Sequence, residues 1–87
     1  MKRKHAKTLE LLFSRPVSGN VKWKEAVSLM EALGAETFER EGSRIAFILD
    51  GAILHQHKPH PSPDMDKGAV AAMRDFLRGL GYKPLKE

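Results

Sequence analysis

Residues 36–57, ETFEREGSRIAFILDGAILHQH, decide the fold of this chain. Apolar Ile45, Phe47 and Leu49 alternate with the residues between them, which is the pattern of a strand with one buried face. The dipeptide Asp50-Gly51 after this run is a strong signal for a tight hairpin turn. The stretch therefore predicts a three-stranded antiparallel sheet, whose other two strands and second turn are expected at residues 37–40, 53–57 and Gly42-Ser43.

Two helices are predicted on the amino-terminal side of this sheet. Apolar residues recur at helical spacing over residues 21–33, and Gly34 supplies a left-handed stop. A shorter helix around Leu9 is expected to end before Pro16, because a proline disfavours the helical conformation of the residue that precedes it. The isolated His5, in the basic start of the chain, is expected at the surface.

One more helix is predicted after the sheet. Pro59, Pro61 and Pro63 interrupt regular structure beyond the last strand, because proline lacks an amide donor. Asp64 or Asp66 is expected to cap the helix that follows. The apolar stripe of this helix is assigned to Val70, Met73, Leu77 and Leu80. The end of the helix is assigned to Gly81.

The predicted fold is α+β: a short extra helix, then the order α-β-β-β-α, with the helices packed on one face of a three-stranded antiparallel sheet. This is the arrangement of double-stranded-RNA-binding domains. All 87 residues are expected to form one domain, since a chain of this length has room for a single modest core. That core is expected at about residues 20–82, with residues 1–16 as an amino-terminal helical extension.

The composition is basic and contains no cysteine. Fifteen Lys and Arg residues oppose eleven Asp and Glu residues, and the net charge of +4 favours an anionic partner. Nucleic acid and an acidic protein are both partners of the opposite charge. A membrane surface fits less well, because no helix joins a broad apolar face to a strongly basic one and no segment has transmembrane length. The lack of cysteine excludes a disulfide framework and a thiolate nucleophile, and it suits the reducing cytoplasm.

Three of the four histidines lie within residues 55–60, at the end of the third predicted strand. Imidazoles exchange protons near neutral pH and also ligate metals. His55, His57 and His60 are therefore candidates for acid-base chemistry or for a metal site. Surface loops also often contain histidines that have no function, and the cluster alone leaves these three interpretations open.

Five short motifs in a fixed order resemble the HicA-type toxins of bacterial toxin-antitoxin systems. They are Lys22-Trp23-Lys24, Leu33-Gly34-Ala35, Glu41-Gly42-Ser43, Pro59-His60 and Lys67-Gly68. The resemblance implies a small cytoplasmic endoribonuclease that cleaves messenger RNA without a metal or other cofactor. It also implies a cognate HicB-like antitoxin protein that neutralises the toxin.

The chain departs from that family's pattern at Arg44. The family usually has a histidine directly after Gly-Ser in the strand turn, whereas Arg44 follows Gly42-Ser43 here. A guanidinium stays protonated at physiological pH, so Arg44 cannot act as a general base, but it can bind a phosphate with two parallel hydrogen bonds. We therefore predict that His57 and His60 perform the proton transfers of RNA cleavage and that Arg44 stabilises charge or binds RNA.

Other residues are assigned to RNA binding, because folds of this kind meet phosphates through cationic side chains at the start of the last helix. They are Ser43, Lys58, Lys67, Gly68, Arg74 and Arg78. Trp23 is in register with the apolar stripe of its helix, which favours a core position over a platform for base stacking. A second hypothesis is a non-catalytic module that has lost the strand histidine and binds RNA or an acidic antitoxin through the same surface.

Overall fold

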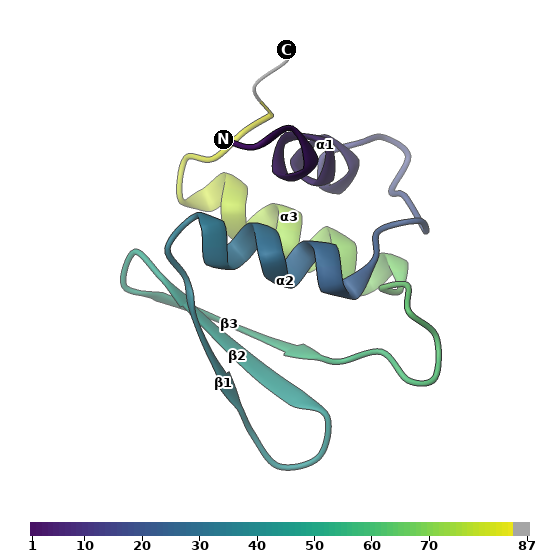
Figure 1. Ribbon diagram of the computed structural model, residues 1–87, viewed down its shortest axis with the longest axis vertical. Helices are drawn as coiled ribbons and strands as arrows, with labels where there is room; N and C mark the ends of the chain where they lie inside the picture. Colours follow the sequence, from purple (N-terminus) through teal and green to yellow (C-terminus); the bar gives the residue numbers. More distant parts are fainter. Residues whose placement is uncertain (85–87) are drawn as a thin grey trace.

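The protein has three helices and three strands within residues 1–84, the part of the chain that this computed structural model describes. Their order is the order predicted from the sequence (Figure 1). The elements are α1 (Arg3–Leu12), α2 (Trp23–Ala32), β1 (Glu36–Glu39), β2 (Arg44–Leu49), β3 (Ala52–His57) and α3 (Lys67–Gly79).

Strand β2 lies at the centre of an antiparallel sheet with the order β1-β2-β3. The hairpin between β2 and β3 turns at Asp50 and Gly51, whose φ angles are 53° and 80°. A two-residue hairpin turn of this kind needs positive φ at both positions, which Asp and Gly adopt more readily than bulkier residues. The turn predicted at Asp50-Gly51 is confirmed, and in the register that follows from it Arg44 pairs with His57.

The helices form two layers over one face of the sheet. α2 and α3 cover that face, and α1 packs against both of them on the side away from the sheet (Figure 1). The opposite face of the sheet is open, and Phe38 and Ile53 on it are 43% and 55% exposed. Alternate residues of a strand point to opposite faces, so Arg44 and His57 lie on the open face while Phe47 enters the core.

One hydrophobic core joins these layers. Burial of apolar side chains is the main driving force of folding, and every helix contributes to the same cluster. Its largest fully buried side chains include Phe47 and Leu49 of β2, Leu29 and Met30 of α2, Met73 and Leu77 of α3, and Leu9 and Leu12 of α1.

The ends of α2 and α3 are defined by the residues that the sequence indicated. Gly34, with φ at 103°, ends α2, and the amide of Ala35 after it donates to the carbonyl of Met30. At the start of α3, the Asp66 side chain accepts a hydrogen bond of 2.7 Å from the amide of Ala69. Of the two candidate caps, Asp66 is therefore the one used.

The amino-terminal helix differs from its prediction in one respect. α1 begins at Arg3, well before its apolar residues, and His5 on it is only 7% exposed. The expectation of a surface His5 is therefore wrong. The buried side of α1 is formed by residues at helical spacing, of which the first two are polar: His5, Thr8, Leu9 and Leu12.

Candidate functional site

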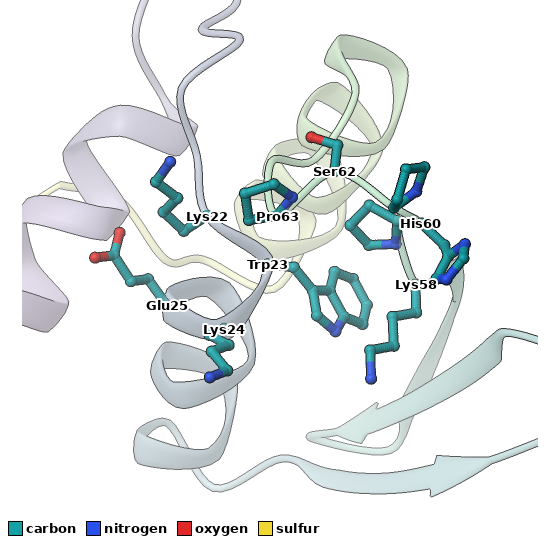
Figure 2. Close-up of a pocket in the computed structure, with 10 residues that line it drawn as sticks. Lys22, Trp23, Lys24, Glu25, Lys58, His60, Ser62 and Pro63 are labelled. Carbon is teal, nitrogen blue, oxygen red and sulfur yellow. The ribbon is translucent and has the colours of Figure 1, made fainter.

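A pocket of 540 Å³ opens between the start of α2 and the loop that follows β3 (Figure 2). One wall comes from the first turn of α2, and the other comes from the proline-rich loop before α3. The lining residues are Lys22, Trp23, Lys24 and Glu25 on the helix side and Lys58, Pro59, His60, Pro61, Ser62 and Pro63 on the loop side.

Backbone hydrogen bonds hold the two walls together. The amide of Trp23 donates to the carbonyl of Pro63 at 2.9 Å, and the amide of Met65 donates to the carbonyl of Val21 at 2.8 Å. Between these bonds, Lys22 and Asp64 form an isolated antiparallel bridge. The pocket is therefore built by two segments that lie far apart in the sequence, and the loop is anchored to the start of α2.

Trp23 belongs to the core and to the pocket at once. Its side chain is 7% exposed, and its ring lies 5.9 Å from that of Phe47 at a tilt of 60°. This geometry is that of a favourable aromatic pair, and the prediction that Trp23 is a core residue is confirmed. The remaining part of the indole lines the pocket, and Figure 2 shows it between the side chains of Lys24 and Lys58.

The cations around the pocket fall into two groups. The ammonium of Lys22 lies 2.9 Å from the Asp64 carboxylate, whose hydrogen bond and negative charge raise the pKa of Lys22. Lys24 and Lys58 form no ion pair with any of residues 1–84. Figure 2 shows the carboxylate of Glu25 directed away from Trp23. The side of the pocket that contains Trp23 is therefore positively charged, because its two exposed lysines are not neutralised.

His60 and His57 border different hollows. His60 is exposed and lines the pocket together with Lys58. His57 lies on the open face of the sheet as the cross-strand partner of Arg44, and it borders a second hollow of 240 Å³ that also contains His55 and Asp66. The predicted catalytic residues are thus brought to the same end of the sheet, but not into one cavity.

A backbone hydrogen bond between Ser43 and Lys58 lies next to both histidine positions, at the end of β3. The amide of Lys58 donates to the carbonyl of Ser43 at 2.7 Å, which extends the pairing of β2 with β3 by one residue beyond Arg44 and His57. The end of the sheet therefore has Arg44 and His57 on its open face, and the pocket that Lys58 lines lies beside the same strand end.

The cations predicted on α3 lie apart from this pocket, since none of them is among its lining residues. The side chain of Lys67 lies against Gly19: a Cβ added to Gly19 would be 3.5 Å from the Cε of Lys67. Gly68 follows Lys67 in the first turn of α3. Arg74 and Arg78 both donate to the same carboxylate oxygen of Asp75, at 3.2 and 2.7 Å, and the side chain of Arg74 is only 14% exposed. The charge of these two arginines is partly neutralised on their own helix.

The geometry gives no support to a metal site. Among residues 1–84, no group of three His, Asp or Glu side chains is arranged to hold a metal ion. The alternative of a site formed by His55, His57 and His60 is therefore not supported.

Neither the pocket nor the position of Lys24 in it could be predicted from the sequence. No local signal shows that the start of α2 and the loop after β3 meet, because their contact depends on the complete sheet between them. The spacing of Pro59, Pro61 and Pro63 was the available hint, since three alternating prolines form a stiff apolar wall.

The fold and the pocket together define a class of protein: a small α+β domain with the order of a double-stranded-RNA-binding domain and a basic hollow at one end of its sheet. A family model described as the HicA toxin of bacterial toxin-antitoxin matches residues 23–82, from the start of α2 to just beyond α3. The chain belongs to this toxin family. No curated protein and no solved structure matches it. No helix within residues 1–84 has the length and apolar character needed to cross a membrane.

Proposed function

We propose that this member of the HicA toxin family is a metal-independent endoribonuclease that cleaves messenger RNA in the cytoplasm and is neutralised by a cognate HicB-like antitoxin. The observation that supports the proposal most strongly is the pocket, which combines the imidazole of His60, the indole of Trp23, and the ammonium groups of Lys24 and Lys58, which form no ion pair with any of residues 1–84. Cationic and aromatic groups of this kind are what single RNA nucleotides bind.

Cleavage without a metal needs three chemical contributions. A base takes the proton of the 2′-hydroxyl, whose oxygen attacks phosphorus. The bond to the 5′-oxygen breaks, and an acid returns a proton to that oxygen, so that a 2′,3′-cyclic phosphate and a free 5′-hydroxyl result. Cations stabilise the charge of the transition state. Histidine is suited to both proton transfers because it exchanges protons near neutral pH.

We assign these roles to the end of the sheet. An RNA backbone that crosses the end of β3 at Lys58 has His60 on the pocket side and His57 on the side of the open face. One histidine acts as base and the other as acid, while Arg44 holds the phosphate through its guanidinium. Ser43, which precedes Arg44 in the chain, is assigned to a contact with the same backbone.

The cations of α3 have a secondary part in this proposal. Lys67 and Gly68 open α3, and Arg74 and Arg78 share Asp75. These residues contribute to a positive surface that attracts RNA rather than to bond cleavage, because association with a polyanion depends on the summed charge.

The alternative is a binding module without catalysis, and one observation favours it. Arg44 stands where the family usually has its histidine, so the common proton carrier of the family is absent from β2. In this second proposal the same pocket binds RNA, or an acidic antitoxin occupies it, and no bond is broken.

Cleavage of a labelled, unstructured RNA in excess EDTA tests these proposals. We expect the wild type to cut, and His60→Ala and His57→Ala each to lower the rate by about 10²- to 10⁴-fold, the usual contribution of a general acid or base. His55→Ala is the matched control, since this exposed histidine lies on the same strand as His57 and has no assigned role. Its rate should equal that of the wild type.

The outcomes separate the two proposals. If the double variant His57→Ala, His60→Ala cuts as fast as the wild type, the assignment of proton transfer is wrong. If the wild type binds the RNA but leaves it intact, the binding module is correct. Arg44→Lys and Arg44→Ala then distinguish the role of the guanidinium, because lysine keeps the charge but not the two parallel hydrogen bonds.

A further inference from the structure

The pocket is of the size and chemistry that a single nucleotide requires. Its volume of 540 Å³ lies within the range of about 300–1,000 Å³ that is typical of small-molecule sites. Pro59, Pro61 and Pro63 supply apolar surface on the loop side of the pocket, which suits the flat faces of a base. A base that is stacked and paired within a duplex cannot enter such a cavity, because its faces and its edge are already covered.

The rim of the pocket supplies the groups that a phosphate needs. Lys24 and Lys58 flank Trp23 and have no carboxylate partner among residues 1–84, whereas Lys22 is held by Asp64 (Figure 2). A nucleotide whose base lies against Trp23 would therefore have a lysine on each side of it. Apolar walls with cations at the rim are the usual construction of sites for single strands.

The surface on which folds of this kind meet duplex phosphates is altered here. The Asp66 carboxylate occupies the start of α3 and accepts a hydrogen bond from Ala69, which puts a negative charge where a phosphate would approach. Further along α3, Asp75 engages both Arg74 and Arg78. Both features disfavour docking of a duplex along α3, although the order of the elements is that of a duplex-binding fold.

We infer that the pocket takes one unpaired nucleotide of single-stranded RNA, with its base against the prolines and the exposed edge of Trp23 and its flanking phosphates on Lys24 and Lys58. The inference rests on the proposal that the protein acts on RNA, and it names the form of RNA. Because the walls are apolar, the pocket selects an unpaired base over a paired one and discriminates little among the four bases.

Trp23 is the single tryptophan of the chain, so its fluorescence reports directly on the pocket. The probe is a short 2′-O-methyl RNA oligonucleotide, which cannot be cut because its 2′-oxygen is blocked. It is titrated into the full-length protein alone and as a duplex with its complement, at one salt concentration. We expect a saturable change in fluorescence with the single strand and at least tenfold weaker binding of the duplex.

Variants at the rim test the position of the nucleotide. Lys58→Ala and Lys24→Ala are expected to weaken binding of the single strand by roughly tenfold, a loss in the range given by charge-assisted phosphate contacts. Lys7→Ala is the matched control, because it removes the same charge from the exposed side of α1. Trp23 itself is not substituted, since its packing against Phe47 makes a loss of folding the expected result.

Equal affinity for single strand and duplex overturns the inference. So does binding that is detected by anisotropy of a labelled oligonucleotide while the Trp23 emission stays constant. A protein that binds the single strand as expected but does not cut RNA in EDTA contradicts the nuclease proposal and leaves this inference intact. A protein that cuts RNA but binds duplex as tightly as single strand contradicts this inference alone.

Discussion

Arg44 determines which chemistry the start of β2 can perform. Its guanidinium holds a positive charge but does not transfer protons at physiological pH. Arg44 faces His57 across the strands. An imidazole thus lies beside Arg44 on the adjacent strand, and this pairing is the residue-level basis for the proposal that His57 and His60 transfer protons.

Tyr82 provides a prediction about pH. Its hydroxyl donates to the Asp50 carboxylate at 3.0 Å, and burial, this hydrogen bond and the charge of Asp50 raise the pKa of Tyr82 above its ordinary value of 10.0. Stability from this contact is therefore fully present below pH 10.0 and is lost as the pH rises through the higher pKa of the folded protein. Tyr82 is the only tyrosine of the chain, so tyrosinate absorbance should show a single midpoint above pH 10.0.

Asp50→Asn is the matched control for this titration. The substitution removes the charge and tolerates the positive φ of the turn, because Asn adopts that conformation readily. Its midpoint should move down towards 10.0 while part of the effect of burial remains. A wild-type midpoint at or below 10.0 would contradict the contact between Tyr82 and Asp50.

At the scale of elements, the capping of α3 by Asp66 is open to direct measurement. Asp66→Ala removes the acceptor of the Ala69 amide, and the free energy of unfolding should fall by about 1 kcal/mol, the usual effect of losing an amino-terminal cap. Urea denaturation checks this value. Asp66→Asn keeps an acceptor and should change stability by much less, so equal losses in the two variants would mean that the side chain does not cap the helix.

The elements could be predicted where the signal is local. Gly34 stops α2 and Asp50-Gly51 turns the hairpin because both depend only on backbone conformations that few residues adopt. The choice between Asp64 and Asp66 as the cap could not be made, since it depends on Lys22, which binds Asp64 from a distant part of the chain. The burial of His5 was missed for the same reason, because a polar residue becomes part of a helix face only when another helix covers it.

At the scale of the whole molecule, α1 is predicted to be required for stability although it lies outside the range that matches the toxin family. Leu12 is fully buried between the helices. Leu12→Ala should lower the free energy of unfolding by about 2–5 kcal/mol, because the shortened side chain leaves a cavity. Thermal denaturation measures the loss.

Glu10→Ala is the control for this prediction, since Glu10 is exposed on the same helix. The control should change stability by no more than about 0.5 kcal/mol. If Leu12→Ala is equally mild, α1 does not belong to the core. The sequence predicts that α1 is a helix but not where it packs, because nothing local in the sequence shows which side of the molecule a terminal helix will cover.

The sequence singles out candidate residues for the site, whose roles stay predictions, but it does not show the shape of the site. His57, His60, Lys58 and Arg44 stand out in the sequence by residue type, and the structure places them at one end of the sheet. Their division between the pocket and the open face follows from the alternation of β3 and from the direction of the loop after it. The direction of that loop cannot be predicted from the sequence, because it is a property of the folded chain alone.

The bridge that closes the pocket also determines when the site comes into existence. Its two residues, Lys22 and Asp64, flank the entire sheet in the sequence, so the walls can meet only after the segment that contains all three strands has been made. Contacts between distant segments form late in folding, because closing the intervening chain costs entropy. A nascent chain that ends before Asp64 therefore has no second wall, and the pocket can form only once this residue has been synthesised.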